Sequence, residues 1–315
     1  MASKIPTIDF CKPDLKPGTA QWDSTKAQVF QALKEYGCFE AIYDKIPKEI
    51  GEAMFDTLKE IFPLECKLRE YLDKPFARYQ DQLPHTPFND IRRTADLLLP
   101  ESVETFVNTF WPDGNPHNSN VVNTYSKSLM ELDEMLKRMI LESLGLKNYT
   151  DEFLAQNSFS LRLINYKKEV PQGEDVNKPR MTGHTDTGFL TIVKQDQAGL
   201  QVQMKNGDWI EPNVSPNSFV VLVADSLMAW TNGQLSSAFH RVKMAGDIDR
   251  FSIMLFASPK PGYIVEAPKE LVDEEHPMLF KPYDIVGYYK HVISGFGYGS
   301  LGYGARDLLK AYCGV

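Results

Sequence analysis

Two histidines and one aspartate have the residue types and the spacing of a metal site. His184 and Asp186 are two positions apart, and residues i and i+2 of a strand point to the same face, so both can reach one ion. His240 follows 54 positions after Asp186. Two imidazoles and one carboxylate leave open positions on an octahedral metal, which is typical of non-haem Fe(II) sites. The alternative is a strand histidine with a surface carboxylate nearby.

A second pair of candidate residues, Arg250 and Ser252, opens a strongly apolar segment. A guanidinium on the same strand face as a hydroxyl would be costly to bury there without an anion. An arginine fork and a serine hydroxyl together make a carboxylate clamp. The alternative is an arginine at a strand edge that pairs with Asp247 or Asp249.

The composition is that of a folded globular chain. Its 315 residues are 43% hydrophobic and 24% charged, which excludes disordered, collagen-like and membrane-embedded classes and predicts one large unit. The net charge of -8 disfavours binding to nucleic acid or to anionic membrane surfaces. No apolar run is long enough for a signal peptide or a membrane span, so we expect a cytoplasmic protein.

Residues 1–150 have mostly helical patterns. Asp23 or Ser24 is expected to cap a first helix, which should end at Gly37 because glycine adopts the left-handed conformation that closes helices. A second helix is predicted over residues 48–62, before a proline.

The clearest predicted helix comes later. Apolar residues recur at steps of three and four from Tyr125 to Leu144, the spacing that places them on one helical face, and Gly145 should end the run. Residues 71–120, by contrast, are poorly periodic and rich in proline and aromatic residues. We expect that region to be mostly loops.

From residue 159 onward, short β-branched and aromatic runs alternate with turn residues, which is typical of antiparallel strands. Asn206 and Gly207 tolerate positive φ, so a tight hairpin should join Gln203 to Trp209. Many short strands at near-regular spacing predict a sandwich or a cupin-like jelly roll, with helices again only near residues 283–291 and 306–312. The expected strands are 161–166, 190–193, 200–204, 209–210, 219–223, 238–243 and 250–256.

Short motifs follow one another in order along nearly the whole chain. They are Ile5–Asp9, Glu35–Phe39, Gly183–Asp186, Gly199–Val202, Gly207–Ile210, Thr231–Gly233, His240–Val242 and Arg250–Ser252. With this order, the sequence resembles the plant 2-oxoglutarate and Fe(II)-dependent dioxygenases. Lys16–Thr19, Trp22 and the closing Leu309–Val315 further resemble the branch that contains alkenyl-glucosinolate-forming dioxygenases and deoxypodophyllotoxin synthase.

The resemblance implies a fold that is mainly β with flanking helices, around a double-stranded β-helix (jelly roll, cupin-like) core. We accordingly expect residues 1–150 to form a mostly helical N-terminal region packed on that core. Residues 151–315 should form the jelly-roll catalytic core with a C-terminal helix, and both parts should make one catalytic unit. The branch implies a monomer that acts on a small molecule of specialised plant metabolism.

The resemblance also implies the cofactors and the site. His184, Asp186 and His240 would hold Fe(II), and 2-oxoglutarate would chelate the ion while Arg250 and Ser252 fix its far carboxylate. O2 is then the second cosubstrate, and ascorbate serves as reductant. The implied reaction is hydroxylation, desaturation or oxidative ring closure of the substrate, with release of succinate and CO2.

One departure concerns the strand before the metal pair, where the family often has Asn-Tyr-Tyr-Pro. This chain has Ile164-Asn165-Tyr166-Lys167. Counting from the preceding basic residue places Tyr166 at the tyrosine that touches the cosubstrate, whereas aligning Asn165 directly would place Lys167 there. We predict that Tyr166 is the contact; the alternative is a cross-strand aromatic residue without that role.

Other functions fit parts of the pattern. A ferrous oxidase that uses ascorbate without 2-oxoglutarate, as aminocyclopropane-carboxylate oxidases do, would keep the metal residues, and so would a non-catalytic ligand-binding jelly roll. Zinc-dependent hydrolysis would leave Arg250 and Ser252 without a role. For substrate contacts, the candidates are residues 71–120, the strand end Phe256–Ser258 and the glycine- and aromatic-rich residues 295–304, which are either a lid or a connector.

Overall fold

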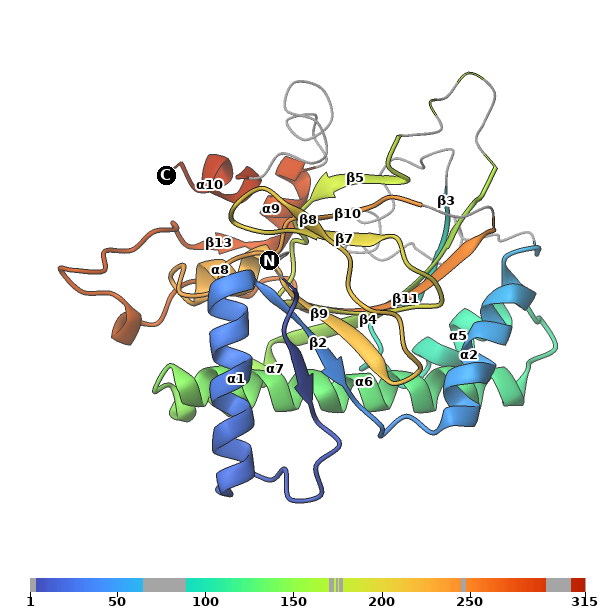
Figure 1. The fold of residues 1–315 in the computed structure, drawn as a ribbon, viewed down its shortest axis with the longest axis horizontal. Coiled ribbons are helices and arrows are strands. Elements are labelled where there is room, and N and C mark those ends of the chain that lie inside the picture. Colours follow the sequence, from blue (N-terminus) through green and yellow to red (C-terminus); the bar gives the residue numbers. More distant parts are fainter. Residues whose placement is uncertain are drawn as a thin grey trace.

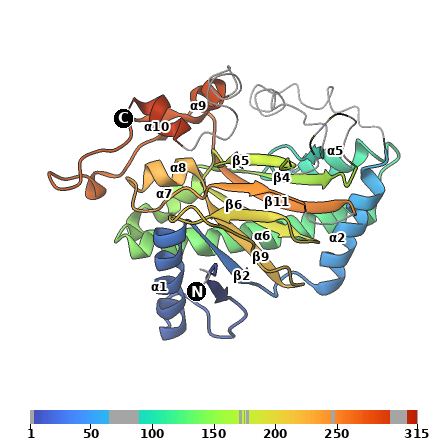
Figure 2. The same cartoon turned by 45° about the horizontal axis from the view of Figure 1, so that its top comes forward.

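The computed structural model describes residues 4–64, 89–169, 173, 175, 178–244, 248–292 and 307–314. Figure 1 shows a long helix, α6, beneath a large β-sheet, with smaller helices at both ends of the molecule. In Figure 2, β5 of a second, smaller sheet lies on the side of the large sheet opposite α6. The expected combination of a mainly β core and flanking helices is therefore confirmed.

The N-terminal segment supplies β1 (Thr7–Asp9), α1 (Ala20–Tyr36), β2 (Cys38–Ile42) and α2 (Lys48–Ile61). The prediction that α1 begins at Asp23 or Ser24 is wrong, because the Thr19 side chain accepts a hydrogen bond from the backbone N–H of Trp22 and caps the helix earlier. Gly37 ends α1 at φ 71°, as predicted. A Cβ at Gly37 would lie 2.4 Å from a backbone oxygen of Ser236, so no larger residue fits there.

The long helix α6 (Pro116–Ser143) contains the predicted periodic face but begins earlier than that pattern. Its start is set by the Asn115 side chain, which accepts a hydrogen bond from the backbone N–H of Asn118. Beyond its end lie η1 (Lys147–Tyr149) and α7 (Thr150–Ala155).

The expectation of a loop-rich region at 71–120 is wrong for the part from residue 89 onward, which contains β3 (Asn89–Arg93), α5 (Ser102–Asn108) and the first turn of α6. Residues 71–88 lie outside the described residues. β3 has almost no apolar alternation of its own. It forms because all five of its residues pair in register with β4.

The remaining strands occur at the predicted places, except that the strand at Met181–His184 is not among those expected from the residue pattern and the strand predicted from residue 161 begins earlier, at Asn157. They are β4 (Asn157–Tyr166), β5 (Met181–His184), β6 (Leu190–Gln195), β7 (Leu200–Gln203), β8 (Trp209–Ile210), β9 (Ser218–Val223), β10 (His240–Val242) and β11 (Arg250–Pro259). The large sheet has the order β1-β2-β9-β6-β11-β4-β3, and the small sheet has the order β5-β10-β7-β8. All pairs are antiparallel except β1 with β2.

Two local predictions need correction. The hairpin between Gln203 and Trp209 is present, but only Gly207 has positive φ, at 91°, so Asn206 does not share that conformation. The prediction that helices return only near residue 283 is also wrong, because α8 (Asp225–Trp230) lies between β9 and β10. Its six residues are too few to display a helical period in the sequence.

The C-terminal segment adds β12 (Ile264–Val265), η2 (Lys269–Leu271), β13 (Tyr283–Asp284), α9 (Ile285–His291) and α10 (Leu308–Cys313). The two predicted terminal helices are thus confirmed. The glycine- and aromatic-rich residues 295–304 lie outside the described part of the chain. No helix among the described residues is long and apolar enough to cross a membrane.

Burial on both faces of the large sheet separates its side chains into two groups. Leu163 and Val221 face the helices and join the core around α6. Ile164, Tyr166 and Val220 lie on the opposite face and join the apolar cluster between the two sheets. Because side chains alternate along a strand, this division fixes which residues of β4 and β11 point between the sheets.

Candidate metal and carboxylate site

The three predicted metal residues meet at the edge of the small sheet. His184 ends β5 and His240 begins β10, where the two are register partners. An Asp186 oxygen lies 3.8 Å from His184 Nε2, and the other lies 3.9 Å from His240 Nε2. One ligand atom from each residue falls within 4.8 Å of the others, which is the spacing around a single ion.

Asp186 reaches the cluster in a different way from that predicted. It lies beyond the end of β5, so strand alternation does not orient it. Its carbonyl instead accepts the backbone N–H of Asp225 at 2.8 Å, and its carboxylate accepts the Thr191 hydroxyl at 2.6 Å. The turn after the strand therefore carries the carboxylate toward the two imidazoles.

Backbone carbonyls orient both imidazoles. Thr182 O lies 2.9 Å from His184 Nδ1, and Ala238 O lies 3.1 Å from His240 Nδ1. A carbonyl accepts only from a protonated nitrogen, so each Nδ1 carries a proton and Nε2 is the ring nitrogen that is left to face the cluster. This is the imidazole form that binds metals.

The electrostatics of the cluster suit a divalent cation. Burial, together with the charge of His240, lowers the pKa of His184 to about 4. Burial opposes ionisation of Asp186, but the two histidines and the Thr191 hydroxyl outweigh it and lower the pKa of that carboxyl. At neutral pH the cluster therefore offers a neutral imidazole at His184 and an ionised carboxylate, the protonation states that bind a metal.

Asp225, a buried carboxylate that was not predicted as a site residue, holds the turn between His184 and Asp186 in place. Asp225 accepts hydrogen bonds from Thr185 at 3.1 Å, Ser237 at 2.7 Å and Tyr288 at 2.7 Å. Thr185 lies between two of the metal residues, so Asp225 ties their turn to α9. Burial raises the pKa of Asp225 to about 6. The sequence signal was weak, because the three donors are spread over more than a hundred residues.

Arg250 is 1% exposed, and its guanidinium is only partly engaged. Its Nε donates to Gln197 O at 3.1 Å, and its Nη2 donates to Gln195 Oε1 at 2.5 Å. Asp249 accepts from Asn165 and from a backbone N–H instead, so the alternative Arg250–Asp249 pair is not formed. Asp247 lies outside the described residues.

Unpartnered polar atoms near Arg250 indicate an anion site. Among the described residues, Arg250 Nη1 and Ser252 Oγ are buried without a hydrogen-bond partner. Leaving such a group unsatisfied costs about 1–3 kcal/mol, and more for a charged one. A carboxylate can accept from both atoms, and the two lie on the same face of β11, two residues apart. The donor set therefore fits one carboxylate group.

Tyr166 faces the same space as Arg250. The two residues are register partners on β4 and β11, and Arg250 Cζ lies 5.0 Å from the Tyr166 ring centre. Asn165 points to the other face, where its amide donates to Asp249 at 3.4 Å. The structure therefore brings Tyr166, and not Asn165, beside Arg250 and Ser252.

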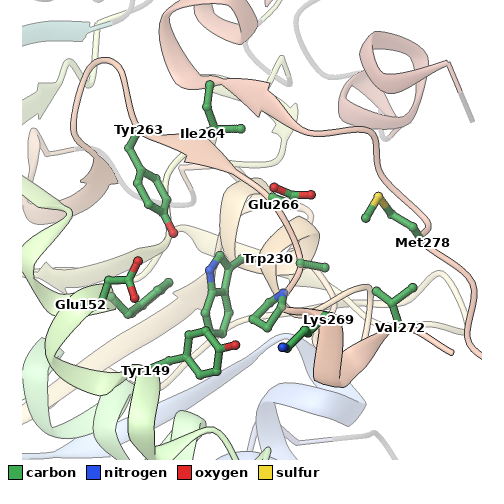
Figure 3. Close-up of a pocket in the computed structure, with 12 residues that line it drawn as sticks. Tyr149, Glu152, Trp230, Tyr263, Ile264, Glu266, Lys269, Val272 and Met278 are labelled. Atoms are coloured by element: carbon green, nitrogen blue, oxygen red, sulfur yellow. The ribbon is translucent and has the colours of Figure 1, made fainter.

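A separate surface pocket of about 540 Å³ is lined by residues of η1, α7 and α8 and of the segment 263–278. Figure 3 shows it between Tyr149, Trp230 and Tyr263, with the Tyr263 hydroxyl directed toward the Trp230 indole. None of the metal residues and none of the residues around Arg250 line it. The pocket is therefore distinct from the candidate site.

Comparisons with known proteins find similar chains over most of this chain's length. Residues 158–259, which contain every predicted site residue, match the family model of the 2OG-Fe(II) oxygenase superfamily. A probable 2-oxoglutarate-dependent dioxygenase of Arabidopsis thaliana, AOP1.2, is 40% identical over 90% of this chain and 89% of its own length.

Two solved structures share the fold. The dioxygenase for auxin oxidation from rice has a TM-score of 0.76 and 25% identity, and covers 98% of this chain and 99% of its own. Its counterpart from Arabidopsis thaliana, solved as a binary complex with 2-oxoglutarate, has a TM-score of 0.74 and 24% identity. It covers 87% of this chain and 99% of its own.

Proposed function

Because the chain belongs to the 2-oxoglutarate-dependent dioxygenases, we propose that it oxidises a small plant metabolite by hydroxylation, desaturation or oxidative ring closure. The family makes the protein an oxidoreductase that uses 2-oxoglutarate and Fe(II). Beyond the family, we propose the class of substrate and the residues that bind the metal and the cosubstrate. This proposal is supported by the plant relatives and by the arrangement of polar atoms between the two sheets.

The single observation that supports it most is the pairing of two donor sets. The His184, Asp186 and His240 ligand atoms cluster within 4.8 Å, and Arg250 Nη1 and Ser252 Oγ on β11 are buried without partners. A 2-oxo diacid has one end that can chelate a metal and another end that needs a cation and a hydrogen-bond donor. Zinc hydrolysis or a bare ferrous site would use only the first set.

In this proposal each residue has a distinct task. His184, Asp186 and His240 hold Fe(II), while Arg250 and Ser252 bind the far carboxylate of 2-oxoglutarate. Tyr166 packs beside the guanidinium, where its hydroxyl can donate to the same carboxylate. When bound, Fe(II) and 2-oxoglutarate supply, with O2, the oxidising power that attacks a substrate C–H bond. Ascorbate would keep the iron ferrous.

The fold contributes by excluding water and by holding these groups still. We assign the two sheets as the two halves of a double-stranded β-helix, or jelly roll, with the site between them. The apolar cluster between the sheets contains Tyr166, Val202 and Met254, so the cosubstrate end of the site is largely desolvated. A dry site strengthens every charge interaction with a bound anion.

The direct test is release of succinate. Purified protein receives Fe(II), ascorbate and 2-oxoglutarate, with and without a panel of small plant metabolites, and succinate is quantified. We expect succinate in the wild type, stimulated by the matching metabolite, and none above background in Asp186→Ala. Succinate at the same level in both proteins, or in neither across the panel, would refute the proposal. Oxidation without succinate would instead indicate the ascorbate-dependent reaction.

A further inference from the structure

Gln195 carries a buried amide whose nitrogen the proposed chemistry does not use. It is the last residue of β6, which lies beside β11 in the large sheet (Figure 2), and it is 4% exposed. Val193, two positions earlier, belongs to the apolar cluster between the sheets, so Gln195 points to the same inward face. Its register partner on β11 is Ser252, and register partners project from the same face of a sheet. Gln195 therefore lies beside the residues proposed to bind a carboxylate.

Arg250 fixes which end of this amide is free. Its Nη2 donates to Gln195 Oε1 at 2.5 Å. A guanidinium has donors only, so it can bind the oxygen of an amide but not the nitrogen. Gln195 Nε2 is left at the other end of the amide, and among the described residues it is buried without a hydrogen-bond partner. The reverse orientation would set two donors against each other.

Three buried donors thus face the space between the sheets from neighbouring positions. Arg250 Nη1, Ser252 Oγ and Gln195 Nε2 all lack a partner within the described part of the chain. Buried polar groups in proteins are nearly always hydrogen-bonded, so three such atoms on touching residues indicate a missing acceptor. The two nitrogens can only donate. One ionised carboxylate offers about four lone-pair sites and can accept from all three groups.

We propose that Gln195 is a third residue that binds the far carboxylate of 2-oxoglutarate, through Nε2, while its Oε1 holds Arg250 in place. The inference rests on the proposed function, because it adds a contact to the cosubstrate. It also makes Gln195 a determinant of selectivity among 2-oxo acids. An apolar far end would leave all three donors buried and unsatisfied, so the site selects an acceptor at that end.

A purely supporting role for Gln195 leads to different expectations. If the side chain only held Arg250, its oxygen would matter and its nitrogen would have no function. Gln195→Glu keeps an oxygen for Arg250 but replaces the donor with a second acceptor. Gln195→Met keeps a similar length and removes both polar groups. The two variants therefore test the donor and the acceptor of one side chain.

The experiment compares the affinities of two 2-oxo acids. Protein loaded anaerobically with Mn(II) is titrated in a calorimeter with 2-oxoglutarate and with 2-oxopentanoate, which has the same chelating end but a methyl group in place of the far carboxylate. The ratio of the two dissociation constants reports on contacts with the far carboxylate, because a change at the metal affects both ligands. Gln201→Met is the matched control, since Gln201 Oε1 also accepts from an arginine, Arg241 at 2.7 Å, on the small sheet.

We expect the wild type and Gln201→Met to share the same strong preference for 2-oxoglutarate. Gln195→Met should reduce that preference about tenfold, the value of one hydrogen bond to a charged group, with little change in the affinity for 2-oxopentanoate. Gln195→Glu should reduce it further, because its carboxylate repels that of the ligand. Unchanged binding of 2-oxopentanoate shows that each variant is folded. A wild-type preference in Gln195→Met or in Gln195→Glu would overturn the proposal.

A double variant separates direct contact from support of Arg250. Gln195→Met is combined with Arg250→Lys, in which no guanidinium remains to be held in place. We expect the preference for 2-oxoglutarate to be lower in the double variant than in Arg250→Lys alone. An equal preference in these two proteins would show that Gln195 acts only through Arg250 and would overturn the proposed contact.

Failure of the proposed function would give a different result from failure of this inference. In that case the Mn(II)-loaded wild type would bind the two 2-oxo acids equally, which would overturn both the carboxylate site and the role of Gln195. A strong preference for 2-oxoglutarate in the wild type that survives in both Gln195 variants would overturn the role of Gln195 alone.

Discussion

His184 and His240 are register partners on adjacent antiparallel strands, and their ring centres lie 4.2 Å apart. Two protonated imidazoles at that distance would repel each other, and burial adds to the cost of charging either of them. Burial and the neighbouring His240 lower the pKa of His184 to about 4. The arrangement therefore keeps the two Nε2 atoms available for a metal ion between them and Asp186.

The first prediction concerns metal binding without cosubstrate. Asp186→Ala should remove the only carboxylate of the cluster and abolish stabilisation by Mn(II). In the wild type, an ion at roughly 100 times its Kd should add about 2.7 kcal/mol to the free energy of unfolding. Urea unfolding with and without Mn(II) measures the effect. Asp273→Ala is the matched control, because Asp273 contacts an exposed histidine elsewhere. Equal stabilisation of Asp186→Ala would disprove the ligand assignment.

The second prediction concerns the far carboxylate of 2-oxoglutarate. Arg250→Ala should weaken 2-oxoglutarate binding by about 2–5 kcal/mol, because it leaves the carboxylate buried without its cation. The affinity of Arg250→Lys for 2-oxoglutarate should lie between those of the wild type and Arg250→Ala, since an ammonium keeps the charge but cannot form two parallel hydrogen bonds as a guanidinium does. Calorimetric titration of the Mn(II)-loaded protein measures it, with Arg138→Ala as a surface control. An unchanged affinity in Arg250→Ala would mean that Arg250 binds something else.

The third prediction concerns Asp225. Burial raises its pKa to about 6 in the folded state, above the usual 3.8, so the folded chain holds this proton between those values and the unfolded chain does not. The stability that wild type has relative to Asp225→Asn should therefore be largest at low pH. It should fall by about 3 kcal/mol in all between pH 3.8 and pH 6, of which about 2 kcal/mol lies above pH 4.5, and it should level off above pH 6.

Urea unfolding of the metal-free proteins from pH 4.5 to 7.5 tests this prediction. Asp208→Asn, in the exposed hairpin turn, should show no such trend. A difference between wild type and Asp225→Asn that stays constant or grows with pH would contradict the assigned protonation state. The comparison isolates Asp225, because every other titrating group is present in both proteins.

The fourth prediction concerns a fully buried ion pair inside α6. Lys137 Nζ lies 2.7 Å from Asp133 Oδ2 and also donates to Asn157 at the start of β4. Burial raises the pKa of Asp133 and lowers that of Lys137. Lys137→Met should destabilise the protein by about 3–5 kcal/mol because it leaves an unpaired buried carboxyl, whereas adding Asp133→Leu should recover much of the loss. Urea unfolding measures both variants. If the double variant is as unstable as Lys137→Met alone, the unpaired Asp133 carboxyl is not the cause of the lost stability.

The sequence predicted best those features that depend on local pattern. The strands β6, β9 and β11 are rich in apolar and β-branched residues, and α6 has a continuous apolar face, so their sequences alone predicted these elements. His184 and His240 could be proposed as ligands of one ion before the fold was known, because they stand in a strand-rich context with Asp186 and because Arg250 and Ser252 follow them in the order of a known family. The resemblance to a family then supplied the order of these elements.

The features that the sequence missed depend on partners far along the chain. β3 forms through its register with β4, and Asp225 matters through hydroxyls on three other segments. The turn that carries Asp186 is held by backbone contacts that no residue pattern encodes. The division into a helical part and a core at residue 150 stays a prediction, although β1 and β2 add strands from the first part to the large sheet.

The central claim is that one ferrous ion and one 2-oxoglutarate share this site, and an anaerobic spectrum tests it most directly. Fe(II) and 2-oxoglutarate are added to metal-free protein, and the visible absorption of a ferrous 2-oxo acid complex is recorded. We predict the band in the wild type and in His276→Ala, an exposed histidine outside the site, and its loss in His240→Ala. Iron bound to the wild type without the band, or a band that persists in His240→Ala, would contradict the account.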